Sequence, residues 1–144
     1  MPINRPKHLM IIGGGVFQVP AIKIAKSMGL KVVVTDYNPE SEGMLLADYP
    51  IEVSTRNINL TVNTAKQFHI ACPLDGVMTV GTDASQTVAA VADALNLPGI
   101  PFEVAERATD KIKMRQVLQE KGVPVPQFRP VWTLDEGREA LNSM

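Results

Sequence analysis

The sequence predicts an α/β fold in which helices flank a parallel β-sheet. Three short runs, residues 9–12, 32–35 and 75–80, are rich in apolar and β-branched side chains. Runs of this kind are typical of parallel strands that are buried on both faces. Segments with apolar residues at helical spacing lie between the runs. This alternation of strand and helix, with short connections, favours right-handed crossovers within one sheet.

The first helix is predicted between residue 18 and Gly29. Apolar residues recur at helical spacing at Ala21, Ala25 and Met28, and Gly29 stands where helices commonly end. Pro20 is tolerated only in the first turn of a helix, because deeper in the helix proline removes a hydrogen bond and clashes, at a cost of about 3 kcal/mol. The helix is therefore expected to begin near Gln18, and the loop before it to be long and open.

The remaining elements of the first unit follow in order. Residues 51–54 form a weaker strand candidate. Two further helices are predicted by apolar residues at helical spacing, which are Ile58, Val62, Ala65 and Phe68 in one, and Val88, Val91, Ala92 and Leu95 in the other.

A different unit is expected after residue 103. Two prolines and a glycine punctuate residues 97–103, and Thr109 is a candidate N-cap for a helix that runs to Gly122. Three prolines predict an extended stretch over residues 123–134. A last helical pattern starts near Asp135.

Composition excludes several functional classes. The chain has 144 residues, of which 45% are hydrophobic, and its net charge is −1, so no broad basic surface indicates binding to nucleic acid or to anionic lipid. Cys72 is the single cysteine, which leaves no disulfide framework and no zinc cluster. No apolar run is long enough to cross a membrane, and no signal peptide is recognised. We expect a cytoplasmic protein.

The glycine-rich loop after the first strand is the strongest candidate for a ligand site. Gly13 and Gly15 match the first two glycines of the dinucleotide-binding pattern G-x-G-x-x-G, and Asp36 stands roughly where a ribose-binding acid is expected. Gln18 replaces the third glycine of that pattern. Three functions stay open: an anion site at the helix N-terminus, an NAD(P)- or FAD-binding module of an oxidoreductase, and a non-catalytic interaction domain. A tight turn without a ligand is the structural alternative.

The order of several motifs resembles the N-terminal part of the ATP-grasp ligase superfamily. This superfamily includes the carbamoyl phosphate synthase large subunit, biotin carboxylase and carboxyaminoimidazole ribonucleotide synthase. The motifs are, in order, "GGGVFQVPAI", "VVVTDYNPESEGMLLADYPIEV", "DGVMTVGTDAS", "LNLPGIPFE" and "ATDKIKMRQVLQEKGVPVP". The resemblance implies a Rossmann-like preATP-grasp domain over residues 1–107 and the incomplete beginning of an ATP-grasp domain over residues 108–144.

The resemblance also implies a set of site residues. Enzymes of this kind use ATP to phosphorylate a carboxylate or bicarbonate, and an amine or another nucleophile then attacks the acyl phosphate. The substrate-binding residues that follow by analogy are Gly14, Gly15, Phe17, Gln18, Asp36, Asn38, Gly81, Thr82 and Asp83. Their loops leave the carboxyl ends of parallel strands, where open α/β sheets bind ligands. Asp83 also has Gln86 three residues later, so a capping box is an alternative role for it.

Lys111 and Lys113 are the candidates for contact with ATP phosphates, and a solvated helix face is the alternative for both. ATP and Mg²⁺ are implied for the full-length enzyme, although neither is expected to bind tightly to this chain alone. The remaining ATP-grasp region is expected in cis or in trans, so this chain alone is predicted to lack ligase and ATPase activity. The expected partner is a small carboxylate, bicarbonate or a phosphorylated metabolite, and related enzymes suggest a homodimer. No catalytic or metal-binding residue is predicted within the 144 residues.

Overall fold

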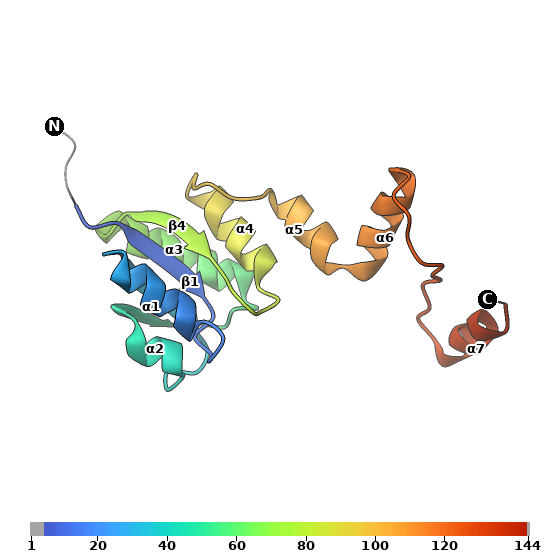
Figure 1. Ribbon diagram of the computed structural model, residues 1–144, viewed down its shortest axis with the longest axis horizontal. Helices are drawn as coiled ribbons and strands as arrows, with labels where there is room; N and C mark the ends of the chain where they lie inside the picture. Colours follow the sequence, from blue (N-terminus) through green and yellow to red (C-terminus); the bar gives the residue numbers. More distant parts are fainter. Residues whose placement is uncertain (1–4, 144) are drawn as a thin grey trace. The chain divides into compact units, whose positions relative to one another are not determined.

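The structure is a computed structural model that describes residues 5–143. The chain divides into two compact units after Thr109, and each unit is described by itself. The first unit carries the sheet, and Figure 1 shows its strands beside α1, α3 and α4.

The first unit contains a four-stranded sheet in the order β3-β2-β1-β4, in which every neighbouring pair of strands is parallel. The strands are β1 (His8–Ile12), β2 (Lys31–Asp36), β3 (Tyr49–Glu52) and β4 (Leu74–Met78). The predicted α/β fold with a parallel sheet is confirmed. The third strand begins two residues earlier than the sequence indicated, because its alternation of half-buried and exposed residues marks an edge strand with a weak apolar signal.

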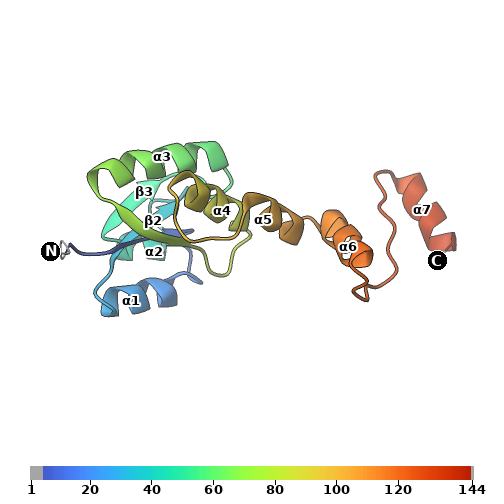
Figure 2. The ribbon, with the colours of Figure 1, turned by 90° about the horizontal axis from the view of Figure 1, so that it is seen from above.

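Helices cover both faces of the sheet. On one face, α1 (Val19–Ser27) and α2 (Glu42–Leu46) pack on a core that includes Ile11, Val34 and Met44. On the other face, α3 (Ile58–Ala71) and α4 (Ser85–Ala94) cover a second core that includes Met10 and Val33. Figure 2 shows α1 and α3 on opposite sides of the strands. Because side chains of a strand alternate between faces, β1 and β2 contribute to both cores, and their central residues, 9–12 and 32–34, are all apolar.

Local signals explain most helix ends. Gln18 is the N-cap residue of α1, and Pro20 lies in the first turn as expected. Gly29 follows the end of α1 with a positive φ of 79°, the left-handed conformation that glycine adopts without strain. The side chain of Asn57 accepts a hydrogen bond from the N–H of Leu60 at the start of α3.

The short helices α2 and α5 (Phe102–Thr109) were not predicted. A five-residue helix is too short to show apolar periodicity, and α5 begins within residues 97–103, where two prolines and a glycine predicted only a change of unit. The second unit contains α6 (Lys111–Glu120) and α7 (Leu134–Ser143), joined by a segment without regular secondary structure.

The predicted N-cap Thr109 is wrong. Asp110 caps α6 and accepts hydrogen bonds from the N–H groups of Ile112 and Lys113, whereas the Thr109 hydroxyl donates back to the Ala105 carbonyl in α5. A carboxylate is the better acceptor at a helix N-terminus because it also interacts favourably with the helix dipole.

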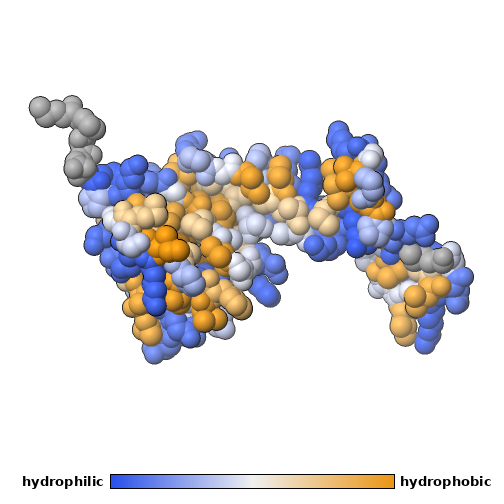
Figure 3. Space-filling model, viewed as in Figure 1, coloured by the Kyte–Doolittle hydropathy of each residue, from blue (hydrophilic) through white to orange (hydrophobic). Residues whose placement is uncertain are grey.

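The surface of the first unit carries apolar side chains among the polar ones, as Figure 3 shows for one face. Ile24 on α1, the C-cap residue Met28 and Leu45 on α2 are each at least 61% exposed. Isolated exposed apolar residues are normal on a protein surface. The expected homodimer therefore stays a prediction.

Candidate functional site

An open cleft of about 560 Å³ lies at the carboxyl ends of the strands. The loops that follow all four strands contribute to it. Its lining residues are Gly13, Gly15, Gln18, Asp36, Tyr37, Ser54, Thr55, Arg56, Gly81 and Thr82. The chain runs outward from β1 to β2 and β3 on one side, and β4 lies on the other side of β1. The cleft therefore lies at the point where the strand order reverses, which is where open α/β sheets bind ligands.

The loop between β1 and α1 presents free backbone donors. The N–H of Gly13 donates to the Thr35 carbonyl, and the N–H of Gln18 donates to the Gly15 carbonyl. Within the described residues, the N–H groups of Gly15, Val16 and Phe17 have no hydrogen-bond partner. Three successive unpaired amides just before a helix N-terminus favour an anion, because the helix dipole adds partial positive charge there.

Gly14 is clamped from two sides and does not line the cleft. Its N–H donates to Oδ2 of Asp36 at 2.7 Å, and its carbonyl accepts from the N–H of Gly43 at 2.7 Å. A Cβ on Gly14 would lie 2.7 Å from Oγ of Ser41 and 3.0 Å from Cγ of Met44, so a larger residue would require these side chains to shift. Gly14 was predicted to bind substrate, but the structure places it where the glycine loop packs against α2. Its two hydrogen bonds hold the loop in position.

Asp36 braces the same loop. Its side chain is 9% exposed. Oδ2 accepts from Gly14, and Oδ1 accepts from the N–H of Asn38 at 2.9 Å. The carboxylate lies on the cleft wall, as the sequence suggested, but each of its oxygens is already bonded to a backbone amide. In a dinucleotide site the corresponding acid would bond the ribose hydroxyls.

Gln18 and Phe17 were both predicted to face a ligand, and the structure separates them. Phe17 is 71% exposed, whereas Gln18 is 4% exposed and its Nε2 donates to the carbonyl of Val80. The amide of Gln18 therefore links the glycine loop to the loop after β4. A Cβ on Gly81, which has a φ of 64°, would lie 2.9 Å from Cβ of Phe17, so these two loops pack closely.

The segment Ser54, Thr55 and Arg56 lines the cleft and was missed by the sequence analysis. It follows β3, so the rule that carboxyl-end loops bind ligands would have found it. The strand was predicted over residues 51–54, so the loop at its carboxyl end was expected two residues too late. Arg56 is the single cationic residue among those that line the cleft.

The other predicted residues lie outside the cleft lining. Asn38 makes an Asx turn, in which its Oδ1 accepts from the N–H of Glu40 at 3.0 Å. Asp83 is exposed, and the capping box suggested for it is wrong: Ala84 is the N-cap residue of α4, without a side-chain hydrogen bond. The Gln86 side chain donates instead to the hydroxyl of Thr109.

Lys111 and Lys113 are exposed on α6, within the second unit. Their backbones form the first turn of the helix that Asp110 caps. Their contact with ATP stays a prediction.

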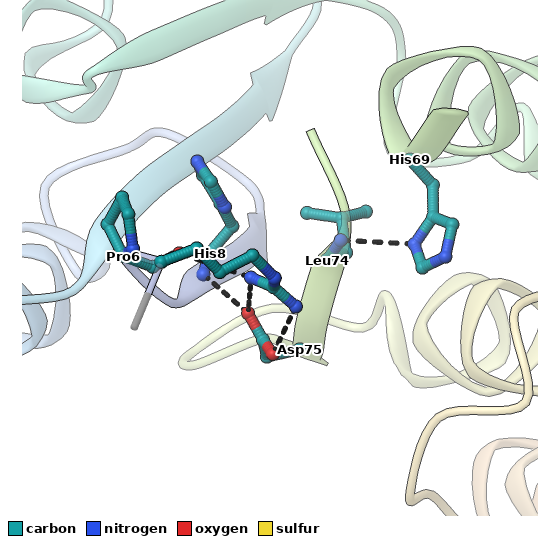
Figure 4. A network of polar contacts seen from close by, with 6 residues as sticks. Pro6, His8, His69, Leu74 and Asp75 are labelled. Atoms are coloured by element: carbon teal, nitrogen blue, oxygen red, sulfur yellow. Dashed lines mark hydrogen bonds and ion pairs between the residues drawn. The ribbon is translucent and has the colours of Figure 1, made fainter. Parts of the chain in front are cut away.

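His8 is the first residue of β1, and His69, near the end of α3, contacts the first residue of β4, so both histidines lie at the amino ends of strands while the cleft lies at the carboxyl ends. Figure 4 shows the polar contacts around His8, His69, Leu74 and Asp75. Nδ1 of His69 accepts from the N–H of Leu74, and the N–H of His8 donates to Asp75. The imidazole of His8 packs against Tyr49 and Phe68. Both histidines are thus part of the packing around the start of β1 and β4.

The carboxyls with shifted pKa values also lie away from the cleft. The hydrogen bonds from the Arg5 guanidinium lower the pKa of Asp75, although partial burial opposes this shift. For Asp48, burial acts to raise the pKa, but hydrogen bonds from the Val32 N–H and Lys31, with the charge of Lys26, lower it overall. These shifts report structural ion pairs, so they indicate no acid or base for catalysis.

Within residues 5–143, no group of three or more His, Cys, Asp or Glu side chains could hold a metal ion. None of the helices in this range is long and apolar enough to cross a membrane.

Residues 22–99, more than half of the chain, match the ATP-grasp N-terminal domain. The chain therefore belongs to the ATP-grasp N-terminal domain family. The expected resemblance to ATP-grasp ligases is confirmed, and the chain is similar to the N-terminal part of such ligases.

Individual relatives agree with this assignment. The chain is 26% identical over 127 residues to 3-methyl-D-ornithine–L-lysine ligase of Methanosarcina mazei, and the match covers 86% of this chain. It superposes with a TM-score of 0.73 and 29% identity on L-amino acid ligase from Bacillus licheniformis, over 92% of this chain. The TM-score is 0.74, with 27% identity, for phosphoribosylglycinamide synthetase from Anaerococcus prevotii, over 97% of this chain. The chain spans about a third of the length of each of these three proteins, 33–35%.

Proposed function

We propose that this chain is the N-terminal, substrate-side part of an ATP-dependent carboxylate–amine ligase, and that its cleft binds the acceptor substrate. One observation carries the proposal: within a chain of the ATP-grasp N-terminal family, Arg56 and Gly15 line the same cleft at the strand-order reversal, and Gly15 is the first of three successive backbone N–H groups that have no partner within the described residues. Donors of this kind suit a small acid, which is a carboxylate, bicarbonate or a phosphorylated metabolite. The ligase relatives support an acid as substrate, and they do not support an oxidoreductase.

The reaction is proposed to pass through an acyl phosphate, as in carbamoyl phosphate synthase. A carboxylate oxygen of the acceptor would attack the γ-phosphorus of ATP, and ADP would leave with the bridging oxygen. The amine then attacks the acyl carbon, and inorganic phosphate leaves with that oxygen. The cleft contributes by holding the acid in place, since positioning supplies a large part of the rate enhancement in transfers of this kind.

ATP and Mg²⁺ are the cofactors proposed for the complete enzyme. Lys111 suits a phosphate contact, because a compact ammonium on a flexible stem can follow the phosphates. The described residues offer no metal-binding cluster, so Mg²⁺ would be held by the remaining ATP-grasp region, in cis or in trans. A cytoplasmic location is proposed with the same function.

Oxygen-isotope transfer tests the proposed function. The ligase that contains these 144 residues is incubated with ATP, an amine and a carboxylate acceptor labelled with ¹⁸O. A thermal-shift screen of the chain against small acids selects the acceptor, because a bound ligand stabilises the native state. The proposal predicts ¹⁸O in the released phosphate. Product formation with unlabelled phosphate would exclude the acyl phosphate, and failure to form product with any stabilising acid would refute the ligase assignment.

A further inference from the structure

We propose that Arg56 selects the acceptor, and that its guanidinium binds an anionic group, a carboxylate or a phosphate, inside the cleft. This inference rests on the proposed function, because it assigns a specificity residue to the same site. Neither the glycine loop nor the family assignment pointed to this residue.

Arg56 stands on an anchored segment. The hydroxyl of Thr87, on α4, donates to the carbonyl of Thr55 at 2.6 Å, and Thr87 is 2% exposed. The hydroxyl of Thr61, which is fully buried on α3, donates to the carbonyl of Asn57 at 2.9 Å. The residues on both sides of Arg56 are therefore fixed to two different helices. A loop held in this way fixes the backbone that carries the guanidinium, so ordering of the loop adds little to the entropy lost on binding.

The segment also has an internal turn. The hydroxyl of Ser54 accepts from the N–H of Arg56 at 3.3 Å, and the carbonyl of Ser54 accepts from the N–H of Asn57 at 3.0 Å. Asn57 then caps α3 through its side chain. The backbone of Arg56 is thus fixed by the turn that starts the helix.

No residue that the structure describes compensates the charge of Arg56. Over the residues that the structure describes, its guanidinium makes no ion pair and no hydrogen bond. Asp36 is the single carboxylate among the cleft-lining residues, and both of its oxygens are bonded to backbone amides. A guanidinium presents five donors in a planar fork that fits carboxylate and phosphate oxygens in pairs.

The unpaired amides of the glycine loop complete the site. Gly15 and Arg56 line the same cleft, so an anion can meet donors from the loop after β1 and from the loop after β3. These two loops follow β1 and β3, which lie on opposite sides of β2. An acid held between them would have its remaining part free to extend toward Tyr37 or Thr82, which also line the cleft.

Anion titration of the full 144-residue chain tests this inference. Inorganic phosphate and acetate are added separately, and backbone amide shifts are followed by NMR. We expect saturable binding of at least one anion, with shifts at Gly15 and Arg56. Tighter binding of phosphate would indicate a phosphorylated acceptor, and tighter binding of acetate would indicate a carboxylate. Absence of saturable binding by both anions would overturn the inference.

Variants separate a specific site from general charge. Arg56→Gln is expected to weaken anion binding roughly tenfold to a hundredfold, because hydrogen bonds to charged groups are the strong ones. Arg56→Lys is expected to keep the charge but lose part of the affinity. Arg107→Gln is the matched control, since Arg107 lies on α5 outside the cleft lining and makes only an exposed ion pair with Glu103.

Equal losses in Arg56→Gln and Arg107→Gln would show a diffuse charge effect and refute the inference, as would unchanged binding by Arg56→Gln. The isotope experiment tests the proposed function separately from the Arg56 site. Release of unlabelled phosphate would exclude the acyl-phosphate mechanism but would not affect the evidence for the anion site.

Discussion

Gly43→Ala tests whether the glycine loop is held by close backbone packing. Gly43 is the second residue of α2, and its N–H donates to the carbonyl of Gly14 at 2.7 Å. A Cβ at position 43 would lie 2.6 Å from the Gly14 carbonyl oxygen and 2.8 Å from its Cα. These are backbone atoms, so no flexible side chain can move away.

Opposing effects decide whether Gly43→Ala raises or lowers the free energy of unfolding of the first unit. Alanine in place of glycine favours a helix by at most about 1 kcal/mol. Overpacking of a buried contact costs about 1–3 kcal/mol, and loss of the hydrogen bond to Gly14 adds about 0.5–1.5 kcal/mol. The first unit is therefore expected to lose about 1–3 kcal/mol of unfolding free energy. With a urea dependence of about 2 kcal/mol per M, the midpoint falls by roughly 1 M.

Urea unfolding, followed through amide signals of β1 and β2, measures this shift. Gly137→Ala is the matched control, because Gly137 is also helical, on α7, and a Cβ there meets no atom within 4 Å. The control is expected to leave the unfolding of the first unit unchanged. A Gly43→Ala chain as stable as the unsubstituted chain would refute the packing argument.

Three further predictions concern the braces of the site and its surroundings. Asp36→Asn is expected to destabilise the first unit by about 1.5–3 kcal/mol in urea unfolding. The asparagine amide has no negative charge and only one acceptor oxygen, so it cannot accept from the N–H groups of both Gly14 and Asn38. Unchanged stability would contradict the assigned role. Hydrogen bonds from Arg5 lower the pKa of Asp75 in the folded state. The ionised carboxylate therefore contributes its full stabilisation above the pKa that Asp75 has in the unfolded chain, about 3.9, and this stabilisation is lost as the pH falls through the lower pKa of the folded state. Asp75→Asn should therefore reduce stability at pH 6 more than at pH 3, and an equal reduction at both would be inconsistent with the ion pair. Thr87→Val leaves the Thr55 carbonyl without its donor and should cost about 1–3 kcal/mol while weakening phosphate binding; a stability loss with unchanged phosphate affinity would show that the anchor does not position the site.

Apolar periodicity was sufficient to predict the sheet and most of the helices. β1 and β2 are buried on both faces, and residues 9–12 and 32–34 within them are therefore all apolar, which is the pattern the sequence showed. α2 escaped prediction because its position depends on a contact between Gly43 and Gly14, 29 residues apart in sequence. A contact of this kind leaves no periodic signal.

The candidate site could be located from sequence more easily than its residues could be assigned. The rule about carboxyl-end loops led to Gly15 and Gly81, which line the cleft. The same rule could not show that Gly14 and Asp36 bond to one another, because a hydrogen bond between two loops depends on the folded geometry. Arg56 was missed because the strand before it was placed two residues too late.

The central claim is that the cleft binds a small acid in preference to a dinucleotide, because both oxygens of Asp36 accept from backbone amides that hold the glycine loop. Titration of NADH fluorescence with this chain tests that claim most directly. The account predicts no saturable change at micromolar concentrations. Saturable binding of NADH in that range would contradict it.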